Sequence, residues 1–167
     1  MPIKNIIQHP NKILLKKSLP ISNHNDAVEI AKDLLDTLEN SKVPGAGLAA
    51  PQIGINKRVC VVRKFYGDNK YKDIVLINPT IIKYSKEKIL SLEGCLSIKD
   101  TYGYVLRYKK IKISYTDLNG IKKTLKADGF LSRVVQHELD HLEGILFIQK
   151  LVDGKTYTEK ELDKITS

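Results

Sequence analysis

Apolar residues follow a helical spacing in two parts of the chain. Between residues 26 and 41, apolar side chains recur at three- and four-residue intervals, and this spacing predicts an amphipathic helix over 26–41. Asp26, with Glu29 three residues later, suits the first turn of that helix, and Pro44 lies just past its end. The segment 128–144 predicts a second helix, because its apolar residues also repeat at helical intervals.

Strand-forming segments lie between these helices. Asn78–Pro79 separates two of them, and Asn119–Gly120 lies between 110–116 and 121–127, which predicts a β-hairpin. The remaining predicted strands are 58–62, 74–77 and 80–84. The chain therefore combines many strands with few helices.

The C-terminal residues predict one more, short helix. It begins at Thr158, and Glu161 stands at the position of a capping-box partner. Strands without a regular alternation with helices predict an α+β fold. A length of 167 residues suits a single domain, so we expect one domain over residues 1–167.

Composition and charge narrow the class of protein. The chain has 28 basic and 19 acidic residues, a net charge of +9, and its lysines are scattered, which gives a general attraction to polyanions such as RNA. An arginine-rich helix or a stacking motif is absent from the sequence, so we expect no specific nucleic-acid recognition. The N-terminal residues resemble no secretory signal, and the apolar runs are too short for a bilayer. We therefore expect no membrane partner and a reducing cytoplasm, where a free cysteine can bind a metal.

The segment RVVQHELDHLEG carries the first chemical signal. His137 and His141 follow the H-E-x-x-H spacing of zinc-type hydrolases. On a helix, His141 lies about 40° from His137, and Glu138 lies about 100° away, beside both histidines. Both histidines continue an apolar stripe and are expected to face inward. The motif is short and also occurs on ordinary amphipathic helices, and a catalytic metal usually needs three protein ligands.

Two residues could supply a third ligand. Glu161 lies twenty residues beyond His141, a separation that suits a metalloprotease, but it is already explained as a helix cap. Cys95 lies in a short glycine-containing segment that we expect between strands, although a free cysteine is commonly a small buried hydrophobe. Cys60 lies in the middle of a predicted strand and is expected to be such a hydrophobe. The residues alone leave Glu161 and Cys95 as alternatives.

Three stretches together resemble the peptide deformylase family. They are GAGLAAPQ from Gly45 to Gln52, EGCLS from Glu93 to Ser97, and QHELDH from Gln136 to His141. The resemblance implies an α+β fold with mostly antiparallel strands packed around a central metal-binding helix, and it implies that Cys95 is the third ligand. It also implies an enzyme that removes the N-formyl group from the formylmethionine of new polypeptides.

The resemblance further implies a role for individual residues. Cys95, His137 and His141 would bind one divalent metal, natively Fe²⁺, with Zn²⁺, Ni²⁺ or Co²⁺ as substitutes. Glu138 would move protons, while Gln52 and the backbone N–H of Leu96 would stabilise the developing oxyanion. The peptide would contact Gly45, Ala46, Gly47, Leu48, Glu93, Gly94, Phe130 and Val134, and Arg107 would support the site through an ion pair with Glu93.

The sequence also departs from the family's pattern. Many relatives have a proline after EGCLS, where this chain has Ile98 and Lys99, and Tyr108 replaces another common proline. Both changes concern the rim of the site and therefore the peptide preference. The C-terminal segment is short for docking on a ribosome, so any ribosome association is expected to be transient. Two other functions are compatible with parts of the sequence: a protease that uses Glu161, and a basic, non-catalytic RNA-binding domain.

Overall fold

The computed structural model describes residues 3–167. Its strands are β1 (Gly47–Ala49), β2 (Val59–Gly67), β3 (Lys70–Tyr84), β4 (Lys88–Cys95), β5 (Ile98–Tyr108), β6 (Lys110–Thr116) and β7 (Lys122–Asp128). The helices are α1 (His24–Glu39), α2 (Gly129–Leu142) and α3 (Glu159–Thr166), and three 3₁₀ turns are η1 (Lys12–Leu15), η2 (Ala50–Ile53) and η3 (Phe147–Lys150).

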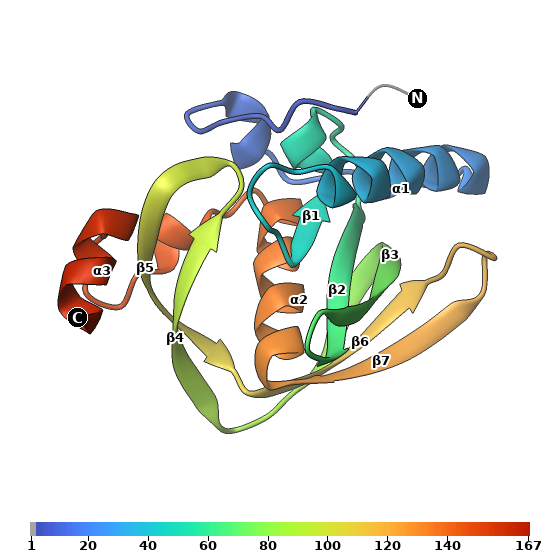
Figure 1. Ribbon diagram of the computed structural model, residues 1–167. Helices are drawn as coiled ribbons and strands as arrows, with labels where there is room; N and C mark the ends of the chain where they lie inside the picture. Colours follow the sequence, from blue (N-terminus) through green and yellow to red (C-terminus); the bar gives the residue numbers. More distant parts are fainter. Residues whose placement is uncertain (1–2) are drawn as a thin grey trace.

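The strands form two antiparallel sheets with α2 between them (Figure 1). One sheet has five strands in the order β1-β2-β3-β6-β7, so β1 is an edge strand, and the other is the hairpin β4–β5. In Figure 1, α2 runs through the middle of the molecule, with the hairpin on one side and the larger sheet on the other. The expected α+β fold with antiparallel strands around a central helix is confirmed.

Strand β2 shows how the core is divided. Alternate residues of a strand point to opposite faces. Val59 and Val61 therefore pack in the cluster beneath α1, whereas Cys60 and Val62 pack in the cluster beneath α2. All four side chains are fully buried. Because β2 is covered on both faces, it fixes the positions of both helices relative to β1.

The predicted break at Asn78–Pro79 is wrong. β3 runs continuously through these residues, and a bulge between Ile77 and Thr80 absorbs them. A bulge accommodates a proline because the missing N–H need not join the strand ladder. Asn78 adopts a positive φ of 48°, and its side-chain amide exchanges two hydrogen bonds with the backbone of Ile21 at 2.8 and 3.0 Å. The Asn78 side chain thus supplies hydrogen bonds to the backbone of Ile21 at the point where β3 is irregular.

The helices are close to their predicted positions, with one correction at the start of α1. The N-cap is Asn23, whose side chain accepts a hydrogen bond from Asn25 N at 3.0 Å, and Asp26 lies inside the first turn. α3 begins as predicted, with Thr158 and Glu161 forming a capping box. Among residues 3–167, no helix is both long and apolar enough to cross a bilayer.

Candidate metal centre

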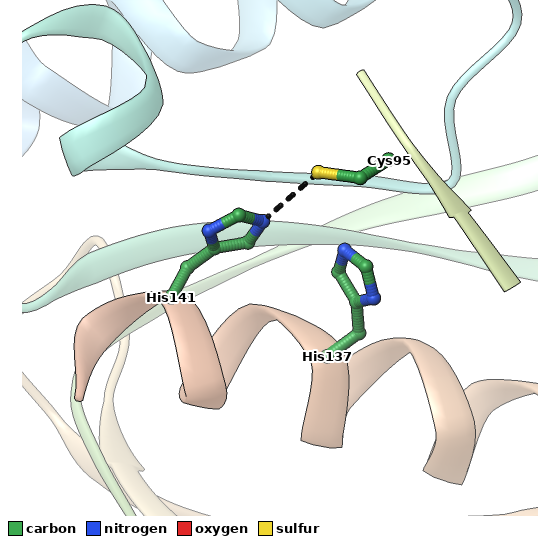
Figure 2. Close-up of side chains that lie close together, drawn as sticks. All are labelled: Cys95, His137 and His141. Atoms are coloured by element: carbon green, nitrogen blue, oxygen red, sulfur yellow. Dashed lines mark hydrogen bonds between the residues drawn. The ribbon is translucent and has the colours of Figure 1, made fainter. Parts of the chain in front are cut away.

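Three side chains from two distant parts of the chain converge beside α2. Cys95 is the last residue of β4 rather than part of a loop between strands, while His137 and His141 lie one turn apart on α2. Figure 2 shows both imidazoles rising from α2 towards the thiol of Cys95. One ligand atom from each of the three residues lies within 4.8 Å of the others. Within the described part of the chain, this is the group whose geometry could hold a metal ion.

The spacing of these atoms fits a shared ion. Cys95 Sγ and His141 Nε2 are 3.3 Å apart. Two ligands at bond lengths of about 2.1 and 2.3 Å from a tetrahedral ion are separated by roughly 3.6 Å. His141 is 1% exposed, and its Nδ1 has no partner among the described residues. One thiolate and two imidazoles form a donor set suited to a late first-row divalent metal such as iron, nickel or zinc.

A buried network of charges orients His137. Its Nδ1 is 2.9 Å from Glu93 Oε1, which directs Nε2 away from Glu93 and towards Cys95 and His141. Arg107 donates hydrogen bonds to both carboxylate oxygens of Glu93, at 2.8 and 2.9 Å, and a third hydrogen bond to Asp140. The expected Glu93–Arg107 ion pair is therefore present. Asp140 was not assigned a role from the sequence, although it stands inside the H-E-x-x-H segment and three residues after His137.

The network also sets the charge of Glu93. Burial on its own would raise the pKa of this carboxyl, but the hydrogen bonds from Arg107 and His137 outweigh burial and lower the pKa to about 2. Glu93 is thus an anion at neutral pH. A fixed anion behind a histidine holds the ring's proton on Nδ1 and leaves Nε2 free to bind a metal.

Glu138 lies next to the two histidines without joining the ligand group. It is 4% exposed, and its Oε2 has no hydrogen-bond partner among residues 3–167. Burial raises the pKa of its carboxyl to about 7. β1 passes so close to this side chain that a Cβ on Gly47 would lie 2.6 Å from Glu138 Oε1. Glycine at position 47 is therefore what allows the strand and the carboxylate to lie together.

Gln52 points its amide nitrogen into the site. Its Oε1 accepts a hydrogen bond from Ala49 N at 2.9 Å, which fixes the orientation of the amide group. Nε2 then lies 3.7 Å from Cys95 Sγ and 3.1 Å from Ser97 Oγ. Gln52 is 2% exposed, so this donor is held in place by its surroundings.

Leu96 lies in the tight turn between β4 and β5. The turn is anchored by the N-terminal arm, since Gln8 Nε2 donates to Leu96 O at 2.9 Å and His9 N donates to Ser97 O at 2.8 Å. No role at the site was expected for this arm from the sequence. The arm fixes the backbone next to Cys95.

An open groove with a volume of about 1210 Å³ leads to these residues. Most of the expected substrate-binding residues line it: Gly45, Ala46, Gly47, Glu93, Gly94, Phe130 and Val134. Leu48 does not, because its side chain is fully buried beneath α1. Phe130 is 47% exposed since it stands at the groove and outside the core, although it continues the apolar stripe of α2. Residues of the N-terminal arm and of α3 also line the groove and were not predicted.

Glu161, the alternative third ligand, and Cys60 both lie outside this group. Glu161 accepts a hydrogen bond from Thr158 N at 2.7 Å as a helix cap and is not part of the metal-capable group. Cys60 is fully buried in β2, and burial raises the pKa of its thiol well above the ordinary value. Its thiol is therefore a packed apolar group, as expected.

Comparisons with known proteins identify the family of this chain. The family model described as polypeptide deformylase matches residues 3–157. A peptide deformylase of Pelagibacter ubique is 41% identical over 171 residues, covering 100% of this chain and 97% of that protein. A peptide deformylase of Endomicrobium trichonymphae is 43% identical over 151 residues, covering 90% of this chain and 87% of that protein.

Solved structures give the same result. The crystal structure of peptide deformylase from Ehrlichia chaffeensis superposes with a TM-score of 0.84 at 30% identity, covering 99% of this chain and 96% of that one. The Met-Ala-Ser-bound class I type b peptide deformylase of Acinetobacter baumannii superposes with a TM-score of 0.80 at 32% identity, covering 90% and 100%. The chain belongs to the peptide deformylase family, the enzymes that remove the N-formyl group from newly made polypeptides.

Proposed function

We propose that Cys95, His137 and His141 hold one divalent ion and that ferrous iron is the native one, with zinc, nickel or cobalt as substitutes. The convergence of these three side chains, within 4.8 Å of one another, is the observation that carries the proposal. Such an ion would lower the pKa of a water molecule to about 7 and so make hydroxide available at neutral pH. A thiolate beside a ferrous ion is sensitive to oxidation, which fits a reducing cytoplasm as the place of action.

Glu138 acts as the proton carrier. Its carboxylate flanks both histidines and lies against β1, where the peptide would bind. It accepts a proton from the attacking water and delivers that proton to the leaving amine of the methionine. The carboxylate needs no second protein partner for this, and its Oε2 has none among the described residues.

Gln52 and Leu96 stabilise the charge that develops on the formyl oxygen. Gln52 Nε2 is directed into the site because Oε1 is held by Ala49 N. The backbone N–H of Leu96 follows directly after Cys95, in the turn anchored by Gln8. Donors that are fixed before the reaction stabilise an oxyanion without a reorganisation cost.

The peptide binds as an added strand on the free edge of β1. β1 pairs with β2 on one side only, so those backbone groups of Gly45, Ala46, Gly47 and Leu48 that point away from β2 can pair with an extended peptide. Glu93 and Gly94 form the opposite wall, and the methionine side chain lies near Phe130 and Val134. The deformylase of Acinetobacter baumannii was crystallised with Met-Ala-Ser, a peptide that begins with methionine.

Arg107 has a supporting role in this scheme, since it holds Glu93, which in turn orients His137. The partners are nascent chains that begin with formylmethionine. The net charge of +9 favours a transient association with the RNA-rich ribosome that produces them.

The test is formate release from formyl-Met-Ala-Ser, run without oxygen and with added ferrous or nickel ion. We expect formate from this peptide and little hydrolysis of the acetylated analogue, because the extra methyl group does not fit between Gln52, Leu96 and the metal centre. Glu138→Gln is the control, since it should keep the fold and the metal and lose turnover. Cleavage of internal bonds in an unformylated peptide would indicate a protease instead, and a folded, metal-loaded protein that releases no formate would refute the proposal.

A further inference from the structure

One wall of the groove contains β1, the strand proposed to bind the peptide. This wall begins with an irregular loop, residues 40–45, between α1 and β1. Residues 40–47 line the groove along their whole length. Within residues 3–167, residues 42–45 make no hydrogen bond, and Val43 is 60% exposed. The loop is therefore held only at its two ends and by the packing of Gly45 against Leu38 and Leu96.

One residue, Arg63 on β2, is attached to both ends of this loop. Before the loop, its guanidinium binds Glu39, the last residue of α1, at 2.7 Å. After the loop, its backbone N–H donates to Ala46 O at 2.7 Å. A side chain and a backbone group of the same residue thus set the distance that the six intervening residues must span.

The guanidinium is itself fixed by three further contacts. Asp73, the cross-strand partner of Arg63, accepts two hydrogen bonds at 2.9 and 3.1 Å. The ring of Tyr71 lies 3.9 Å from the guanidinium carbon, and the Tyr71 hydroxyl donates to Glu39 at 2.8 Å. The Arg63 side chain is 10% exposed and the Asp73 side chain 19%, so this pair is partly shielded from water and salt, whereas the Glu39 side chain is 60% exposed. A bidentate, stacked arginine of this kind cannot be replaced by lysine without loss of geometry.

The tolerance for movement at the end of the loop is small. Ala46 is followed by Gly47, where there is no room for even one methyl group beside Glu138. The strand therefore cannot move towards this carboxylate, and a shift of the loop end displaces the free edge of β1 on which the proposed peptide pairs.

We propose that Arg63, with Glu39, Asp73 and Tyr71, is a positioning cluster that holds loop 40–45 so that β1 presents its free edge to the peptide in register with Glu138. Arg63 touches neither the substrate nor the metal ligands and acts through the loop. The inference rests on the proposed pairing of the peptide with β1.

The test compares Arg63→Lys with Arg58→Lys. Arg58 is a matched control because it lies directly before β2, its side chain is 14% exposed, and it also pairs with a glutamate, Glu143 at 2.6 Å, but it does not contact loop 40–45. For Arg63→Lys we expect the KM for formyl-Met-Ala-Ser to rise about fivefold or more, the value of one net hydrogen bond, with a smaller change in kcat. Arg58→Lys should leave the KM unchanged.

Hydrogen exchange of residues 40–46 supplies a readout that does not depend on activity. We expect faster exchange in this segment for Arg63→Lys and unchanged exchange for Arg58→Lys. If Arg63→Lys does not fold, Tyr71→Phe and Glu39→Gln should each produce the same changes with smaller size, since each removes one contact of the cluster. Equal KM values and equal exchange in the Arg63 and Arg58 variants would overturn the positioning role. A wild-type protein that releases no formate would instead refute the proposed function, and the exchange experiment would still decide the role of Arg63 in holding the loop.

Discussion

A methyl group added at Gly47 should lower the rate of catalysis while the protein still folds and binds its metal. A Cβ at this position would lie 2.6 Å from Glu138 Oε1, 2.8 Å from Cγ and 2.9 Å from Cδ. To restore an ordinary contact of 3.4 Å, the carboxylate or the strand must recede by roughly 0.8 Å. Glu138 is enclosed by protein, so the displacement is forced on the group that carries the proton.

The expected effect of Gly47→Ala follows from this displacement. A misplacement approaching 1 Å costs up to about 10² in rate, so we expect kcat to fall about 10- to 100-fold. Overpacking of this size costs about 1–3 kcal/mol of stability, and Tm falls by about 2–4 °C per kcal/mol in a domain of this length. Metal content should stay at the wild-type level, because Glu138 is not a ligand in the proposed scheme.

The measurements are kcat for formyl-Met-Ala-Ser, bound metal per chain, and Tm. Gly45→Ala is the matched control, since its added methyl group would meet only the flexible ends of Leu96 and Leu38, at 2.7 and 2.9 Å. These side chains can move aside, so kcat should fall less than in Gly47→Ala. A Gly47→Ala protein with wild-type kcat would refute the reasoning, and loss of its metal would show that Glu138 helps to bind the ion.

Three further substitutions test the rest of the site. Cys95→Ser should lose bound metal, measured by elemental analysis, whereas Cys60→Ser should keep it because Cys60 is buried in β2. The reverse result would exclude the proposed ligand set. Gln52→Leu should lower kcat by about 10²–10³ with a much smaller change in KM, and a wild-type rate would limit Gln52 to a structural role. Glu93→Gln should weaken the affinity for nickel by about 10- to 100-fold, because His137 loses its anionic partner, and an unchanged affinity on titration of the metal-free protein would refute this role.

Short-range patterns in the sequence were sufficient for several elements. The spacing of apolar residues locates α1 and α2, and the capping box at Thr158 locates the start of α3, because helices depend on contacts between residues three and four apart. The hairpin β6–β7 follows from Asn119–Gly120 for a similar local reason. The same patterns could not show that β3 continues through Asn78–Pro79, since the bulge depends on a hydrogen-bonded partner, Ile21, that is distant in the sequence.

The sequence also determined which residues were candidates for the metal, but the residues alone did not identify the third ligand. The pair His137 and His141 follows from one helical turn, whereas Cys95 and Glu161 both remained candidates for the third ligand until the likeness to a known family was considered. The tertiary structure decides between them, because only the pairing of β4 with β5 and their packing on α2 place the Cys95 thiol beside the two imidazoles. The roles of Asp140 and Arg63 likewise arise only from the fold, since each depends on charged partners brought together by folding rather than by a spacing that can be read along the chain.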